Sequence, residues 1–210
     1  MITNTNTMQK IKFNLIKLIA ATALSIFVYR VYNNIIFENS FRPNLVLLLI
    51  GEIVTVGVAL SAKPAKDYAI NFFALISTAV ATFYFLFVNL NYAVVLLPAW
   101  ITGAIQSIAI IWQIIAKLYL GRSFGLMPAN RGVVTSGPYK VVRHPIYLGY
   151  FINHIGFLLS SFSFYNLALY AALYFFQGIR IWQEEQLLIK DQAYISYTDI
   201  TKYRLIPWLF

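Results

Sequence analysis

The sequence AVVLLPAWITGAIQSIAIIWQIIAKLYL, residues 93–120, is the strongest indicator of the fold class. It carries a single charged residue, Lys117. A helix needs about 20 mainly apolar residues to cross the hydrocarbon core of a bilayer. The stretch is long enough for one crossing, and other apolar stretches lie on both sides of it. The sequence therefore predicts an all-α, polytopic transmembrane helical bundle.

The composition of the whole chain supports this fold class. Of the 210 residues, 60% are hydrophobic and 11% are charged, whereas soluble domains carry about 25% charged residues. These values exclude a disordered protein, a coiled coil and an ordinary cytosolic enzyme. Cysteine is absent, which excludes a disulfide framework, a zinc–thiolate site and a thiol nucleophile.

Six apolar segments are candidates for membrane spans. They are Phe13–Phe37, Leu45–Ala62, Tyr68–Val88, Ala93–Leu120, Pro145–Ser160 and Phe164–Ile179. The last two are short and only residues 161–163 separate them, so five spans with a partly re-entrant hairpin are the alternative. The first segment shows no small-x-small cleavage site, and we interpret it as a retained span rather than a signal peptide.

The net charge of +9 agrees with six spans and cytoplasmic termini. In that topology only Arg30 and Arg42 of the 16 Lys and Arg residues lie outside, which leaves 14 on the cytoplasmic side. An excess of basic residues on that side is the known orienting bias. The expected location is therefore a bacterial inner membrane, with lipids and no nucleic acid as partners; the oligomeric state is left open.

The chain divides into a predicted scaffold, residues 1–120, and a catalytic and cofactor-binding core, residues 121–210. Glu52 is a carboxylate within a predicted span, which makes it a functional candidate by default. We favour the alternative that it is protonated, or hydrogen-bonded to Thr55 or to a neighbouring helix. Polar residues concentrate instead in the core, where loops on a rigid scaffold usually carry binding residues.

The segment Arg143-His-Pro-x-Tyr-x-Gly149 has the features of a binding site. Pro145 suits the first position of a helix, and the residue before a proline is held out of the helical region. His144 should therefore lie beside the free N–H groups of a helix start, where anions such as carboxylates bind. Arg143 adds positive charge, and Tyr147 lies in the first turn. Taken singly, Arg143 could be a cytoplasmic anchor and Tyr147 an interfacial aromatic residue.

Small residues predict close helix packing at two places. Gly149, Asn153 and Gly156 share one helix face, which a ligand or another helix could approach closely. Pro98 and Gly103 in the fourth predicted span suggest a kink or a close contact.

The last long helix carries a pair of glutamates. Arg180 and Glu184 are four residues apart and can pair on one face, while Glu185 points about 100° away and can serve a different partner. The alternative is a solvated helix end. His154 is expected to be a packed or hydrogen-bonded histidine, and two histidines without carboxylates at ligand spacing predict no metal site.

These motifs together resemble the isoprenylcysteine carboxyl methyltransferase family, with phospholipid N-methyltransferases as more distant relatives. The matching pieces are Gly137-Pro-Tyr-x-x-Val-Arg-His-Pro-x-Tyr-x-Gly149, Arg180-x-x-x-Glu-Glu185, Tyr194-x-x-Tyr197, Pro207 and the upstream Leu120-Gly-Arg-Ser-Phe-x-x-x-Pro128. The resemblance covers about the last 90 residues. It departs from the family before Tyr194, where Gln192-Ala193 replaces the usual Phe-Gly.

The resemblance implies methyl transfer from S-adenosylmethionine, with S-adenosylhomocysteine as product, to a lipophilic acceptor that enters from the bilayer. It implies a cofactor site on the cytoplasmic face, built from Gly137, Tyr139, Val142, His144, Pro145, Tyr147, Gly149 and Glu185. The expected catalytic residues are Arg143, Arg180 and Glu184. An isoprenylcysteine-like carboxylate acceptor would need a cation, Arg143 or Arg180, to position it. An amine acceptor would need a base, for which Glu184, Glu185 and His144 are the candidates.

Three other functions compete with this one. A phospholipid or other small-lipid N- or O-methyltransferase would use the same core. A membrane sterol or enone reductase that uses NADPH should need more clustered cations than the sequence offers. A non-catalytic transporter or assembly factor should spread its polar residues over several spans, whereas here they gather in the last 90 residues.

Overall fold

The computed structural model describes residues 43–69, 71–89, 94–125 and 127–209, with isolated residues between 18 and 33. The first predicted span, over residues 13–37, lies largely outside the described residues. Arg30 and Arg42, the two expected outer cations, lie outside them as well.

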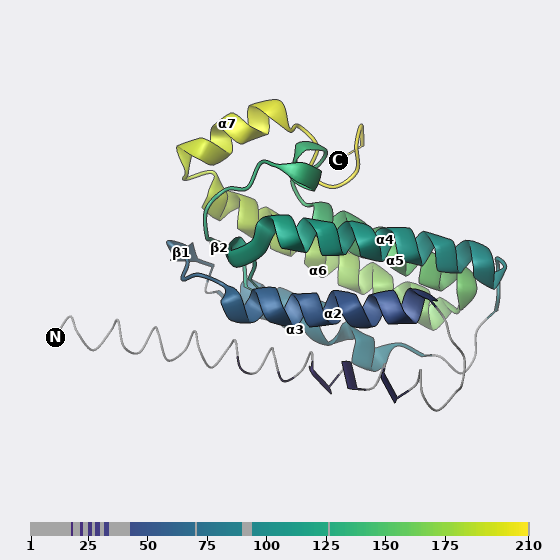
Figure 1. Ribbon diagram of the computed structural model, residues 1–210. Helices are drawn as coiled ribbons and strands as arrows, with labels where there is room; N and C mark the ends of the chain where they lie inside the picture. The colour runs from purple at the N-terminus through teal and green to yellow at the C-terminus, as the bar shows by residue number, and fades with distance from the viewer. Residues whose placement is uncertain are drawn as a thin grey trace.

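Six α-helices contain most of the described residues, and the predicted helical fold class is confirmed. They are α2 (Pro43–Ser61), α3 (Phe72–Phe83), α4 (Ala99–Leu120), α5 (Pro145–Ser160), α6 (Phe164–Leu188) and α7 (Gln192–Ile200). Three 3-10 turns, η1 (Tyr84–Phe87), η2 (Gly121–Ser123) and η3 (Gly137–Lys140), and the antiparallel pair β1 (Asp67–Tyr68) and β2 (Ala129–Asn130), complete the described elements. Helices α2 to α6 lie side by side, and α7 lies outside this bundle, next to the loop that contains η3 (Figure 1).

One described helical stretch, Ala99–Ser123, is both long and apolar enough to cross a membrane. The apolar helical stretches Val46–Ser61 and Phe72–Phe87 are shorter. Helix α5 has the bounds predicted for the fifth span, and α6 continues past the predicted end at residue 179 to Leu188. The count of six spans goes further than these findings and stays a prediction.

Helix α4 starts later than the sequence predicted. Val94 pairs with Phe162 in an isolated antiparallel bridge, and residues 94–98 of the predicted fourth span are not helical. Pro98 stands directly before the first helical residue, Ala99, where its fixed φ and missing N–H are compatible with a helix start. Pro98 therefore precedes the helix and does not kink it. A Cβ on Gly103 would meet nothing within 4 Å, so the predicted close contact at this glycine is wrong.

The glycine face predicted on α5 packs closely against α4. A Cβ on Gly149 would lie 2.3 Å from Cγ of Gln113 and 3.1 Å from the carbonyl oxygen of Ala109. A Cβ on Gly156 would lie 2.8 Å from Cγ of Gln106. The partner numbers fall along α4 as they rise along α5, so the two helices are antiparallel and their contact depends on the missing side chains.

Replacing Gly149 with alanine is expected to destabilise the protein by about 1–3 kcal/mol, because the methyl group would overpack the α4–α5 contact. Gly178→Ala on α6 is the matched control, since a Cβ there would meet nothing within 4 Å. Thermal unfolding in detergent should show a lower melting temperature for Gly149→Ala and none of this loss for Gly178→Ala. Equal melting temperatures would contradict the close packing.

The helix directions bring the polar motifs to one end of the bundle. The α5–α6 hairpin turns at residues 161–163, so the end of α6 returns to the start of α5, and Tyr147 contacts Glu184. Helix α3 runs antiparallel to α6, with Asn71 bonded to Gln183 near one end and Asn89 bonded to Asn166 at the other. The C-terminal ends of α4 and α6 and the N-terminal end of α5 therefore meet.

Candidate functional site

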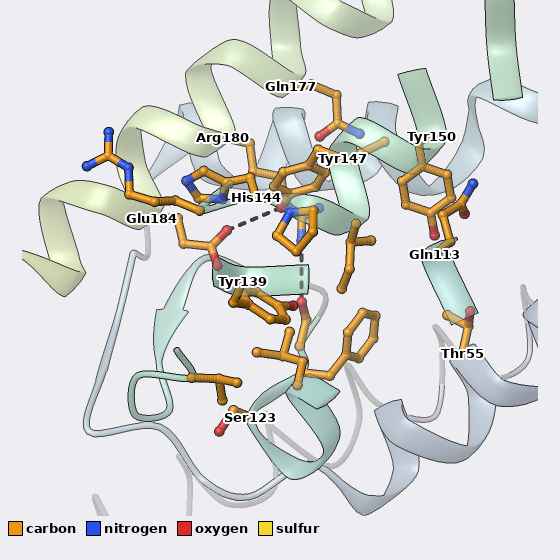
Figure 2. A pocket seen from close by; sticks show the side chains of 18 of the residues that line it. Thr55, Gln113, Ser123, Tyr139, His144, Tyr147, Tyr150, Gln177, Arg180 and Glu184 are labelled. Atoms are coloured by element: carbon orange, nitrogen blue, oxygen red, sulfur yellow. Dashed lines mark hydrogen bonds between the residues drawn. The ribbon is translucent and has the colours of Figure 1, made fainter. Parts of the chain in front are cut away.

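A cavity opens where these helix ends meet, lined by residues of α2, α4, α5, α6 and α7 and of the loop that follows α4. Seven of the predicted site residues line it: Tyr139, Arg143, His144, Pro145, Tyr147, Arg180 and Glu184. Four others, Gly137, Val142, Gly149 and Glu185, are not among the lining residues. Figure 2 shows Arg180 and Glu184 on one side of the cavity and Gln113 and Tyr150 on the opposite side.

The start of α5 has the local geometry that the sequence predicted. Pro145 is the first helical residue and His144 is non-helical, with φ −123° and ψ 60°. The backbone N–H groups of Arg143 and His144 donate to the carbonyls of Tyr203 and Arg204, at 2.9 Å each. The C-terminal segment thus fixes the residues that precede the helix.

Tyr147 links the two helices across the cavity. Its hydroxyl donates to Oε2 of Glu184 at 3.2 Å, and its ring stacks on the imidazole of His144 with centroids 5.7 Å apart. The guanidinium of Arg180 lies 5.8 Å from the centre of the Tyr147 ring and donates to the carbonyl of Gly125 at 3.4 Å. The predicted ion pair between Arg180 and Glu184 is therefore replaced by contacts with Tyr147 and Gly125.

Glu185 is the centre of an ionic cluster behind the cavity wall. Its Oε1 lies 3.3 Å from Nε of Arg143 and 3.2 Å from Nε2 of His144, and its Oε2 lies 2.7 Å from Nε of Arg204. The hydroxyl of Tyr194 also donates to Oε1, at 3.1 Å. Burial opposes ionisation, but the hydrogen bonds from His144 and Arg204 and the charge of Arg143 outweigh it and lower the pKa of Glu185 to about 2. Glu185 would thus act on a bound ligand through His144 and Arg143.

Helix α7 contributes the tyrosines of the Tyr194-x-x-Tyr197 motif. The hydroxyl of Tyr197 donates to the carbonyl of Tyr139 at 2.6 Å, and the three rings form one buried cluster. Burial raises the pKa of Tyr139 and of Tyr194 above the usual value for tyrosine, so both stay neutral hydrogen-bonding groups. Gly137, just before Tyr139, has φ +59°, and a Cβ there would meet the Tyr119 ring at 2.5 Å; this accounts for the glycine.

The sequence did not single out Arg131, which is buried and lines the cavity. Its Nε donates to the carbonyl of Lys63 at 3.2 Å and its Nη1 to that of Met127 at 3.4 Å. A Cβ on Gly125 would lie 2.1 Å from Nη1 of Arg131. The signal available was the run of cations in the loop after α4, but only the fold shows that this one turns inward.

In the inner part of the cavity, both ring nitrogens of His154 have hydrogen-bond partners. Nε2 of His154 lies 2.8 Å from the hydroxyl of Tyr84, and Nδ1 lies 2.7 Å from the hydroxyl of Tyr174. A neutral imidazole has one donor and one acceptor nitrogen, so both are used. The prediction of a hydrogen-bonded histidine inside a helix is confirmed.

Glu52 lines the same inner part and is buried. The predicted partner Thr55 donates instead to the carbonyl of Gly51 at 2.7 Å and accepts from Nζ of Lys117 at 2.7 Å. Lys117, which donates to Thr55, is itself 1% exposed. These contacts favour a structural role for Thr55 and Lys117, and a chemical role of Glu52 stays a prediction.

A family model described as the isoprenylcysteine carboxyl methyltransferase (ICMT) family matches residues 104–190. The match includes most of α4, all of α5, the loop between them and α6, and it confirms the resemblance drawn from the motifs. No curated protein matches the sequence. The tyrosines of α7 and Arg204 lie beyond the matched range, although they contact residues inside it.

Proposed function

We propose that the protein transfers a methyl group from S-adenosylmethionine to a lipophilic acceptor at a membrane, because residues 104–190 match the model of the isoprenylcysteine carboxyl methyltransferase family. The observation that carries this proposal is the Tyr147–Glu184 contact across the cavity, beside His144 at the start of α5. It joins the two most specific motifs of the family resemblance in one cavity wall.

The chemistry of the cavity wall fits this cofactor. Glu184 offers a carboxylate oxygen to a ribose diol or an ammonium group, and His144 at the helix start offers a site for a carboxylate. The rings of Tyr139 and Tyr147 provide aromatic faces for a cationic group. Nε of Arg180 is buried and has no hydrogen-bond partner in the part of the chain that the structure describes. When bound, the cofactor supplies the activated methyl group.

The residues around the cavity would position the acceptor rather than activate it. A carboxylate is already a nucleophile at neutral pH, so holding the reacting atoms close and aligned is the main contribution of the protein. Both arginines line the cavity, and Nε of each is buried without a hydrogen bond to the described residues. Arg143 is held in an ion pair with Glu185, whereas Arg180 has no ion pair among the described residues. We therefore assign acceptor positioning to Arg180. For an amine acceptor the base would be Glu184, because Glu185 and His144 already contact each other.

The membrane topology remains part of the proposal. The family is membrane-associated, and α4 provides one helix that could span a bilayer. Six spans with both termini in the cytoplasm would place the Tyr147–Glu184 wall near the cytoplasmic surface. The apolar part of the acceptor would then enter sideways from the bilayer, and the cofactor from the aqueous side.

Calorimetric titration with S-adenosylhomocysteine tests the proposed cofactor. Detergent-solubilised protein should bind it saturably, and Glu184→Gln should raise the Kd about tenfold or more, because a hydrogen bond to a charged group contributes about 1.5–3 kcal/mol. Glu52→Gln, a carboxylate lining the inner part of the same cavity, is the control and should leave the Kd nearly unchanged. A folded wild-type protein that shows no saturable binding would refute the proposal, and equal effects of the two substitutions would place the cofactor elsewhere.

A further inference from the structure

Three uncharged carboxamide side chains line the cavity, each from a different helix. They are Gln113 of α4, Asn153 of α5 and Gln177 of α6, and we refer to them as the amide shelf. Gln113 is 4% exposed and Gln177 is 7% exposed. Figure 2 shows Gln113 and Gln177 reaching the cavity from separate helices, on different sides of the Tyr147 ring.

Each member of the amide shelf has a buried polar atom without a hydrogen-bond partner among the described residues. These atoms are Nε2 of Gln113, Oδ1 of Asn153 and Oε1 of Gln177. Leaving a buried donor or acceptor unpaired costs about 1–3 kcal/mol, and buried polar groups are paired in the large majority of cases. Three such atoms around one cavity therefore indicate a ligand that pairs with them.

Neighbouring polar groups show that this part of the bundle can satisfy its own side chains. His154, the residue after Asn153, uses both ring nitrogens with Tyr84 and Tyr174. Lys117, one turn beyond Gln113, donates to Thr55. Among the described residues, the other buried side-chain atoms without a hydrogen-bond partner are Nε of Arg143, Nε of Arg180 and Oε1 of Gln183. Of the residues that carry such atoms, all but Gln183 line the cavity, so the unpaired atoms gather around it.

The amide shelf lies deeper in the bundle than the proposed cofactor contacts. Gln177 precedes Glu184 by seven residues on α6, which corresponds to about 10 Å along the helix axis. Asn153 follows Tyr147 by six residues on α5, a similar depth in the same direction. The shelf therefore faces the part of the cavity that remains for the acceptor when the cofactor occupies the Tyr147–Glu184 end.

We infer that the amide shelf binds an uncharged carboxamide group within an otherwise apolar acceptor. A primary amide accepts through its carbonyl, as the free Nε2 of Gln113 requires, and donates through its two N–H groups, as the free oxygens of Asn153 and Gln177 require. A purely hydrocarbon chain would leave all three atoms unpaired. An ion would lose its hydration shell and gain only uncharged partners, which is unfavourable. The assignment of this ligand as the methyl acceptor rests on the proposed function; the affinity of the shelf for an amide does not.

The test compares two probes of equal chain length, the primary amide tetradecanamide and the hydrocarbon tetradecane, with protein reconstituted in nanodiscs. The amide should raise the melting temperature by at least about 3 °C, as expected for a ligand well above its Kd, and tetradecane should not. Gln177→Leu should abolish the shift while leaving the ligand-free protein as stable as the wild type or more so, because it removes an unpaired polar atom.

Gln183→Leu is the matched control on the same helix. Gln183 does not line the cavity; its Nε2 donates to Asn71 at 3.0 Å, and its Oε1 is buried without a partner among the described residues, like that of Gln177. This variant removes a buried carboxamide of the same kind outside the cavity and should keep the shift produced by the amide. Equal shifts from the two probes, or a shift that survives in Gln177→Leu, would overturn the inference. Titration of the same samples with S-adenosylhomocysteine distinguishes failure of the proposed function from failure of this inference. Absence of cofactor binding would refute methyl transfer without contradicting the amide site.

Discussion

Replacing Glu185 with glutamine is expected to lower the free energy of unfolding at pH 7 by about 3 kcal/mol, because it removes the single carboxylate shared by three cationic or basic side chains. Arg143, His144 and Arg204 all contact this carboxylate, and Arg143 and His144 are buried enough that water cannot replace the lost partner. The same loss would free the segment before α5. Cofactor affinity should therefore fall together with stability, although Glu185 does not line the cavity.

The stability that Glu185 provides should depend on pH. Its pKa is lowered from 4.5 to about 2 in the folded protein, so folding favours the ionised carboxyl group. The contribution is fully present above about pH 4.5 and is lost as the pH falls toward 2. The difference in melting temperature between wild type and Glu185→Gln should therefore be constant near neutral pH and shrink in acid.

Asp199→Asn provides the control for Glu185→Gln. Asp199 is an exposed carboxylate on α7, and surface substitutions of this kind change stability by no more than about 0.5 kcal/mol. Unfolding of the three proteins in mixed detergent micelles, followed by circular dichroism from pH 3 to pH 8, measures both effects. If the two variants unfold alike at pH 7, Glu185 is not the centre of the cluster that its contacts indicate.

The helices were the part of the fold most open to prediction from sequence. Pro145 and the short Ser161–Ser163 break fixed both ends of α5, because proline and a polar break act locally and need no knowledge of tertiary structure. The start of α4 could not be found in the same way, since residues 94–97 are as apolar as the helix itself. Their non-helical conformation goes with the pairing of Val94 with Phe162, a contact between segments far apart in sequence.

The same distinction between local sequence signals and long-range contacts applies to the candidate site. The motif residues His144, Tyr147 and Glu184 were predicted, and the fold brings them together. Their detailed partners were not predictable: helical spacing permits a contact of Arg180 with Glu184, but Tyr147 from another helix takes that place. The inward turn of Arg131 likewise depends on the carbonyls of Lys63 and Met127, which no local pattern reveals.

The two candidate arginines, Arg143 and Arg180, differ in their contacts, so replacing them should have different consequences for activity and stability. Arg143 lies 3.3 Å from Glu185 and is engaged in holding the segment before α5. Arg180 is 7% exposed and has no ion pair among the described residues; its Nε, like that of Arg143, is buried without a hydrogen-bond partner there. Its hydrogen bond to Gly125 is long, at 3.4 Å. A cation held in the wall with an unused donor is suited to receive a carboxylate through charge-assisted hydrogen bonds.

Arg180→Met should therefore reduce kcat/KM for methylation of N-acetyl-S-farnesylcysteine about 100-fold or more, since methionine keeps the apolar stem and loses the positioning charge. Arg180→Lys should restore part of the rate, because it returns the charge without the planar donor pair. The Kd for S-adenosylhomocysteine should change far less than kcat/KM. Arg143→Met is the comparison and should lower the melting temperature more than Arg180→Met does, because it removes a partner of Glu185. If Arg180→Met methylates the acceptor at the wild-type rate, Arg180 does not position it. Buried Arg131, another cation of the cavity wall, would then be the next residue to replace.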